Sequence, residues 1–197
     1  MSSAHQTVLF EGQVVVCGER LNPTGKKKLK AALKEGNYEE YVKEAIQQQR
    51  AGADILDVNV GLPGIDETKT MKHVIKLLQE VLNVPLQIDS SHASAIEQAC
   101  RYYNGKPLIN SVNGKDEIME EIFPIVKKYG GVVIGLTLDE NGIPLKAEER
   151  YEIAKKIIKK AATYGIDKKD VIIDCLVLTA SAQQKEVMET VKAVSYG

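Results

Sequence analysis

Short apolar runs that stop on an acidic or amide residue recur along this chain, and each is followed by a helix-like segment. The run P-L-Q-I-D-S-S, residues 85–91, is representative, because it ends on Asp89 and two hydroxyl residues. Strands that alternate with helices form a parallel sheet with right-handed crossovers. Parallel strands all end at one edge, so we expect a shared rim of polar side chains. These are Glu19, Asn22, Asp57, Asn59, Asp89, Asn110 and Asp174.

The periodicity predicts six βα units in order. The expected strands are 14–17, 55–60, 85–89, 107–110, 132–137 and 171–174. The expected helices are 38–51, 66–82 with Asp66 as the N-cap, 92–103, 117–129, 147–164 and 183–194. The first strand is wholly apolar and should therefore be covered on both faces. Pro124 should kink or shorten the helix that contains it.

Two α/β architectures could accommodate this order. A doubly wound sheet gathers its polar residues at one switch point, whereas a (β/α)8 TIM barrel places them after every strand. Every strand contributes here, so we favour the barrel. Such barrels typically need about 250 residues, and this chain of 197 residues ends after unit six. We therefore expect a truncated barrel, with residues 1–13 as an arm and 14–197 as units one to six. Its open strand edges would favour a homo-oligomer.

Composition excludes several classes of partner. The net charge is -1 and no basic stripe carries aromatic residues, so we expect no nucleic acid. No apolar stretch approaches the roughly 18 residues of a membrane span, and no signal-peptide pattern opens the chain. Three distant cysteines without C-x-x-C predict a reducing cytoplasm. Three histidines without ligand spacing predict that the protein holds no metal.

Four individual features have two interpretations each. The run Lys26–Lys28 is a solvated helix face or passes near an anionic ligand tail, and we favour the former. His92 lies close to the rim, but we expect a helix-start or surface residue. Cys175 follows Asp174 directly, yet its apolar neighbours favour a buried small residue over a nucleophile. Cys100 is expected in the core.

Acids and amides on the rim suit a ligand that is rich in N–H donors. A pterin is such a ligand, because its N3–H and 2-amino group form a planar pair that one carboxylate can accept in a forked arrangement. A buried carboxylate needs such a partner, since an unpaired buried charge is costly. The alternative is that Asp57, Asp89 and Asp174 merely cap helices or end strands.

Five segments in this order resemble the pterin-binding methyltransferase family. They are G-E-R-L-N-P-T-G-K-K-K, D-I-L-D-V-N-V-G, P-L-Q-I-D-S-S, P-L-I-N-S-V-N and V-I-I-D-C-L-V-L-T-A. Within the family, the chain is most similar to the methyltetrahydrofolate-binding domains of cobalamin-dependent methionine synthases and to the methyltetrahydrofolate:corrinoid protein methyltransferases. The resemblance covers nearly the whole chain from Val14.

The resemblance implies an enzyme that transfers the N5 methyl group of 5-methyltetrahydrofolate to cob(I)alamin on a partner domain or protein. Asp89, Asn110 and Asp174 match the family's pterin anchors, and Asn110 and Asp174 are the implied catalytic residues. Asn22 and Asn59 match further polar positions after strands one and two. Asp57 and Glu19 complete the expected substrate-binding set.

The family places an asparagine next to N5 after strand seven, which this chain lacks. We therefore expect the chain alone to be a poor catalyst. A homocysteine step would need another domain, because no zinc-thiolate pattern is present. Dihydropteroate synthase is the alternative enzyme, although its expected first loop and Asp-Pro-Gly after strand six are not found. A non-catalytic folate-binding module is the third possibility.

Overall fold

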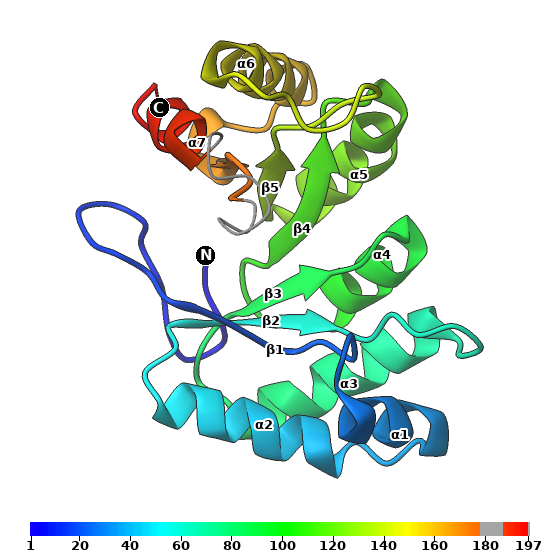
Figure 1. The fold of residues 1–197 in the computed structure, drawn as a ribbon. Coiled ribbons are helices and arrows are strands. Elements are labelled where there is room, and N and C mark those ends of the chain that lie inside the picture. Colours follow the sequence, from blue (N-terminus) through cyan, green and yellow to red (C-terminus); the bar gives the residue numbers. More distant parts are fainter. Residues whose placement is uncertain (178–186, 197) are drawn as a thin grey trace. The chain divides into compact units, whose positions relative to one another are not determined.

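The computed structural model describes residues 1–177 and 187–196, in which strands and helices alternate (Figure 1). The strands are β1 (Cys17–Leu21), β2 (Ile55–Asn59), β3 (Leu86–Asp89), β4 (Leu108–Asn113), β5 (Val132–Leu136) and β6 (Val171–Asp174). The α-helices are α1 (Lys27–Glu35), α2 (Glu39–Arg50), α3 (Glu67–Val81), α4 (Ala93–Tyr102), α5 (Asp116–Tyr129), α6 (Ala147–Thr163) and α7 (Val187–Val194). A short 3-10 helix, η1 (Lys168–Asp170), precedes β6.

The chain divides into two compact units. The first contains Met1–Asn110 and Tyr129–Val132, and the second contains Ser111–Lys128 and Val133–Gly197. In the first unit β1, β2, β3 and the start of β4 are parallel neighbours in sequence order. In the second unit β5 pairs with β6 in parallel. Sequential pairing is the order of a barrel and differs from the order of a doubly wound sheet.

Alternation along the strands of the first unit separates an apolar face from a polar one. Leu56, Val58, Leu86 and Ile88 are at most 1% exposed, and helix α2 packs against β1 and β2 while α4 packs against β3. The intervening residues, Asp57, Asn59, Gln87 and Asp89, must point to the opposite face because side chains alternate along a strand. The core therefore lies between the strands and their helices, and the polar face is left for a site.

Helix α3 has the N-cap that the sequence predicts and one buried apolar face. Asp66 accepts a hydrogen bond from the backbone N–H of Lys69 at 3.1 Å, as expected for an N-cap. Met71, Val74, Ile75 and Leu78 are buried along one face. Cys100 on α4 is buried, which confirms its expected place in the core, and Ile96 and Ala99 on the same helix are buried with it.

The first strand was predicted in the wrong place. It spans Cys17–Leu21 rather than residues 14–17, and Val14 and Val16 are 89% and 52% exposed. Pairing with β2 begins where Cys17 meets Ile55, so the apolar run ahead of it is not covered. Glu19 consequently lies inside β1 and not after it.

Three further expectations agree with the structure only in part. Helix α5 is not shortened at Pro124, because it continues through this residue with buried Phe123 and Ile125 on either side of it, while the expected kink stays a prediction. Strand β4 continues past Asn110 to Asn113. The helix expected over 183–194 is described from Val187 onward, and residues 183–186 lie outside the described part.

Candidate functional site

Three neighbouring parallel strands bring three predicted site residues together. In the register of the sheet, Asn59 at the end of β2 stands opposite Asp89 at the end of β3. Asp89 in turn stands opposite Asn110 in β4. The parallel strands thus place an amide, a carboxyl group and a second amide in one row at the rim of the first unit.

Asp57 lies two residues before Asn59 on β2, opposite Gln87, and its carboxyl group forms a pair with that of Asp89. Asp57 is 5% exposed, accepts a hydrogen bond from Gln87 Nε2 at 2.5 Å and also bonds the side chain of Asn110. Its carboxyl group hydrogen-bonds that of Asp89. Burial, then the negative charge of Asp89, raises the pKa of Asp57 to about 7. A buried carboxyl group and a half-buried one beside it cannot both ionise cheaply, so the pair retains a proton close to neutral pH.

Asp89 accepts a hydrogen bond from the Asn59 amide, whose orientation is fixed by a second hydrogen bond. Asn59 Nδ2 donates to Asp89 Oδ2 at 2.9 Å, while Asn59 Oδ1 accepts from the backbone N–H of Gly61 at 2.8 Å. Burial raises the pKa of Asp89, and the Glu67 charge acts in the same direction. The hydrogen bonds from Asn59 and Asp57 oppose this shift.

A second network lies beside the carboxyl pair. Glu67, in the first turn of α3, accepts from the Ser90 hydroxyl and lies 2.9 Å from His92 Nδ1. Ser90 Oγ also accepts from the backbone N–H of His92 at 3.0 Å. His92 is exposed at the N-terminus of α4, which confirms the helix-start interpretation. The network anchors the loop that follows Asp89.

Glu19 and Asn22 lie outside the direct contacts of the pair. Glu19 is exposed on β1, and its charge contributes to the raised pKa of Asp57. Asn22 Oδ1 accepts from the backbone N–H of Thr24 at 2.9 Å, which forms a local turn. Lys27 and Lys28 are exposed on α1, as expected for a solvated helix face.

Asp174 belongs to the second unit. It ends β6 opposite Leu136, and its carboxylate Oδ1 accepts from the backbone N–H of Leu176 at 2.7 Å. Thr137 donates to the Asp174 carbonyl oxygen through its N–H at 3.1 Å and its hydroxyl at 3.0 Å. Cys175 is half-buried, and burial followed by the Asp174 charge raises the pKa of its thiol, which disfavours the nucleophilic thiolate.

Sequence reasoning missed Gln87 and Glu67. Gln87 interrupts an apolar strand two residues before Asp89, so alternation alone could have placed it on the same polar face. Glu67 sits in the first turn of a helix, where an acidic residue is usual. Nothing in the sequence indicated that it would contact the loop after β3.

The described residues 1–177 and 187–196 hold no group of three or more His, Cys, Asp or Glu side chains that could bind a metal. Across the same residues, no helix combines the length and apolar character that crossing a membrane requires. Asp57 and Asp89 cap no helix, since the N-caps of α3 and α4 are Asp66 and His92. Asp89 does end strand β3, as the alternative interpretation also expected, whereas Asp57 lies inside β2.

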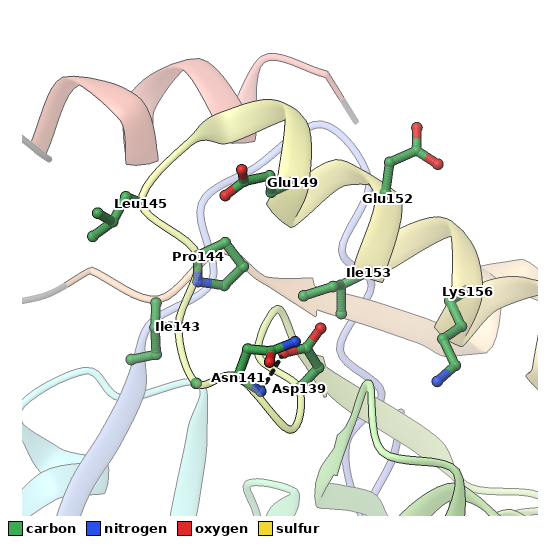
Figure 2. A pocket seen from close by; sticks show the side chains of 10 residues that line it. Asp139, Asn141, Ile143, Pro144, Leu145, Glu149, Glu152, Ile153 and Lys156 are labelled. Carbon is green, nitrogen blue, oxygen red and sulfur yellow. Dashed lines mark hydrogen bonds between the residues drawn. The ribbon is translucent and has the colours of Figure 1, made fainter.

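A separate pocket of about 660 Å³ lies in the second unit, between the β5–α6 loop and α6. Figure 2 shows Ile143, Pro144 and Ile153 among the residues that line it, with Asp139 bonded to the backbone of Asn141. None of the predicted pterin-site residues lines this pocket. It is an open feature of the loop and not the site that the rim residues form.

The first unit thus presents a row of half-buried carboxyl and amide groups beside the buried Asp57, and comparison with known proteins identifies the class to which the chain belongs. The family of pterin binding enzymes matches residues 18–196, so the chain belongs to this family. Among curated proteins, the methionine synthases of Mycobacterium leprae and Mycobacterium tuberculosis are each 29% identical over 98% of the chain. The chain spans only 17% of the length of these relatives.

Solved dihydropteroate synthases share the fold. One from Xanthomonas albilineans, in complex with indole-2-carboxylic acid and 6-chloroguanine, has a TM-score of 0.74 and 19% identity. That comparison covers 95% of this chain and 70% of the other. One from Stenotrophomonas maltophilia has a TM-score of 0.70, again at 19% identity, over 94% of this chain and 70% of that one. The predicted class, a pterin-binding (β/α)8 barrel of which this chain carries six units, is confirmed.

Proposed function

We propose that this chain binds 5-methyltetrahydrofolate and presents its N5 methyl group to a corrinoid carried by a partner domain or protein. The observation that supports this function best is the similarity to methionine synthases over 98% of the chain. The family match supports the coarser statement, which is that the ligand is a pterin. The carboxyl and amide row offers the chemistry that such a ligand needs.

In this proposal Asp89 accepts the paired N–H donors of the pterin. Its Oδ2 already accepts from Asn59, and a carboxylate has about four lone-pair sites, so acceptor capacity remains for a ligand. Hydrogen bonds to a charged group contribute roughly 1.5–3 kcal/mol each. A planar donor pair would also favour the ionised form of Asp89, which burial disfavours in the free protein. Ligand binding and carboxyl ionisation are therefore coupled.

Asp57 is proposed to act as the proton store of the site. With a pKa of about 7 it holds a proton near neutral pH and donates it towards Asp89. When the N5–methyl bond breaks, its electron pair goes to N5, a poor leaving group unless a proton arrives. General acid assistance of this type typically contributes about 10²–10⁴-fold. The corrinoid, when its partner brings it, supplies the nucleophile that accepts the methyl group.

The other predicted site residues are assigned by the family resemblance. Asn110 and Asp174 are proposed as further pterin anchors, and Asn110 also bonds the side chain of Asp57. Asn22, Asn59 and Glu19 are proposed to line the same rim. Three free cysteines, Cys17, Cys100 and Cys175, fit a reducing compartment, so we place this activity in the cytoplasm.

Dihydropteroate synthesis is the second candidate function, since solved structures that share this fold include dihydropteroate synthases. Some of them hold 4-aminobenzoic acid or 7,8-dihydropteroate. Their identity to this chain is 18–20%, which supports the fold more than the reaction. A binding module without turnover is the third candidate.

Calorimetric titration with 5-methyltetrahydrofolate tests the proposal. We expect the wild type and the surface control Glu117→Gln to bind alike, and Asp89→Asn to bind about 10–100-fold more weakly through loss of charge-assisted bonds. Equal affinity for the Asp89 variant would contradict the proposed site. Parallel assays separate the reactions: methyl transfer to cob(I)alamin supports the first function, and conversion of 4-aminobenzoic acid supports the second. Binding without either reaction supports the module.

A further inference from the structure

The largest fully buried side chain in the described part of the molecule is an arginine. Arg150, in the first turn of α6, is 1% exposed. A buried guanidinium is costly unless its donors are satisfied. Among the described residues its hydrogen-bond acceptors are neutral oxygen atoms, three backbone carbonyl groups and one hydroxyl group.

Those acceptors come from three separate segments of the second unit. Arg150 Nε donates to the carbonyl oxygen of Pro144 at 2.9 Å, in the loop before α6. Its Nη1 donates to the carbonyl oxygens of Cys175 at 2.8 Å and Leu176 at 3.4 Å, directly after β6. The same nitrogen donates to Thr190 Oγ1 at 2.6 Å, on α7. The guanidinium therefore ties the end of β6 to two neighbouring elements.

The turn after β6 needs such support, because its backbone is strained. Leu176 has a φ of 58°, and no other non-glycine residue in the described part of the chain has a positive φ. The left-handed conformation costs an L-residue such as leucine free energy, and it persists only where the surroundings hold it. Arg150 supplies this restraint by binding the carbonyl groups of Leu176 and of the residue before it.

The same turn orients Asp174. The N–H of Leu176 donates to Asp174 Oδ1 at 2.7 Å, so the conformation of Leu176 sets the direction of the carboxylate. Thr137 fixes the Asp174 carbonyl from the side of β5. We infer that Arg150 is a positioning residue, which fixes the direction of the Asp174 carboxylate by locking the turn at residues 175–176. This inference rests on the proposed role of Asp174 as a pterin anchor.

Arginine suits this role better than lysine does. Its planar fork presents five N–H donors in fixed directions, whereas an ammonium group is a compact point charge with three. Arg150→Lys would keep the charge but could not span Pro144, the turn and Thr190 together. The conservative substitution therefore separates charge from geometry.

A ligand-free measurement tests the restraint itself. We expect Arg150→Met to speed hydrogen exchange of the Leu176 amide by about 10-fold or more, and Arg150→Lys to give a smaller acceleration. Thr190→Val, which removes one acceptor, should have a small effect of the same sign and remains informative if the Met variant does not fold. The control is Lys159→Met on the exposed side of α6. Unchanged Leu176 exchange in Arg150→Met would overturn the inference.

A double-mutant cycle tests the link to Asp174. Arg150→Met should weaken 5-methyltetrahydrofolate binding about 10-fold alone, yet add nothing in an Asp174→Ala background. Additive losses of affinity in the double variant would overturn the inference. It would also be overturned if Asp174→Ala bound the ligand as tightly as the wild type while Asp89→Asn lost binding. A wild type that binds no pterin would instead reject the proposed function and the link to it. The exchange measurement would then still decide whether Arg150 restrains Asp174.

Discussion

The carboxyl group of Asp57 hydrogen-bonds that of Asp89 across two neighbouring parallel strands, β2 and β3. Each strand alone offers only a polar residue near its end. The register of the sheet brings the two acids together as a pair. The Gln87 amide donates to Asp57, and the Asn59 amide donates to Asp89. The chemistry of the rim therefore depends on this pair more than on any single acid.

Asp57→Asn should alter the pH dependence of stability. The pKa of Asp57 is raised from 3.8 to about 7 in the folded protein, so the native state binds more protons than the unfolded chain between these values. Its contribution to the free energy of unfolding is complete below about pH 4 and falls as the pH rises towards 7, at roughly 1.4 kcal/mol per pKa unit at most. In urea unfolding at pH 4.5, 6 and 7.5, the free energy of unfolding should fall less with rising pH for Asp57→Asn than for the wild type. A variant that declines as steeply as the wild type and as Glu117→Gln would contradict the paired-carboxyl assignment.

Glu67→Gln should lower the pKa of Asp89. The Glu67 charge is one cause of the raised pKa, and glutamine removes the charge while keeping an oxygen that can accept from Ser90. Carbon-13 NMR titration of the aspartate carboxyl groups would measure the shift directly. The isosteric change at an exposed acid of the first unit, Glu35→Gln, serves as control. An Asp89 titration midpoint that moves upwards would show that the network acts in another way.

Asn59→Ala should weaken pterin binding. The variant loses the donor that Asp89 Oδ2 accepts at 2.9 Å, and the carboxyl group loses both support and orientation. Loss of a hydrogen bond to a charged group corresponds to about 10-fold or more in affinity. Asn104→Ala, at an exposed position of the same unit, should bind like the wild type in calorimetric titration. Identical affinities for the two variants would remove Asn59 from the site.

Tyr103→Phe should destabilise the first unit. The Tyr103 hydroxyl accepts from the backbone N–H of Leu86 at 3.0 Å and donates to the carbonyl oxygen of Ser2 at 2.9 Å, which joins β3 to the N-terminal segment. Phenylalanine would leave the buried N–H without its acceptor, at a cost of about 1–3 kcal/mol. Denaturant unfolding should show this loss, with Tyr102→Phe on the adjacent, more exposed residue as the control. Equal stability of the two variants would indicate that another acceptor replaces the hydroxyl.

The order of strands and helices could be predicted from the sequence because each apolar run is bounded by recognisable signals. Asp66 caps α3, and the boundaries of α2, α4 and α6 lie within one residue of expectation at each end. The position of β1 was wrong, since periodicity reports which residues are apolar and not where a neighbouring strand offers partners. Backbone pairing with Ile55 decided that position.

The positions of the polar residues in the site could be predicted from the sequence, but the hydrogen bonds between them could not. Alternation and strand ends placed Asp57, Asn59 and Asp89 on one face, and the register confirmed that Asn59 and Asp89 are neighbours. The hydrogen bond between two carboxyl groups depends on distances across strands, which no sequence pattern reports. The fork of Arg150 joins segments that are 25 to 40 residues apart in sequence, so it could not be read from local spacing either.

The fixed amide of Asn59 has a consequence for the form of the ligand. Because its oxygen already accepts from Gly61, Asn59 can present only its NH2 group to Asp89, and the lone pairs of that carboxylate that no protein donor uses can serve only as acceptors. A heterocycle that exchanges a proton between ring nitrogen and exocyclic oxygen would bind there as its N–H tautomer. The site would thus select one tautomer of its ligand before any chemistry begins.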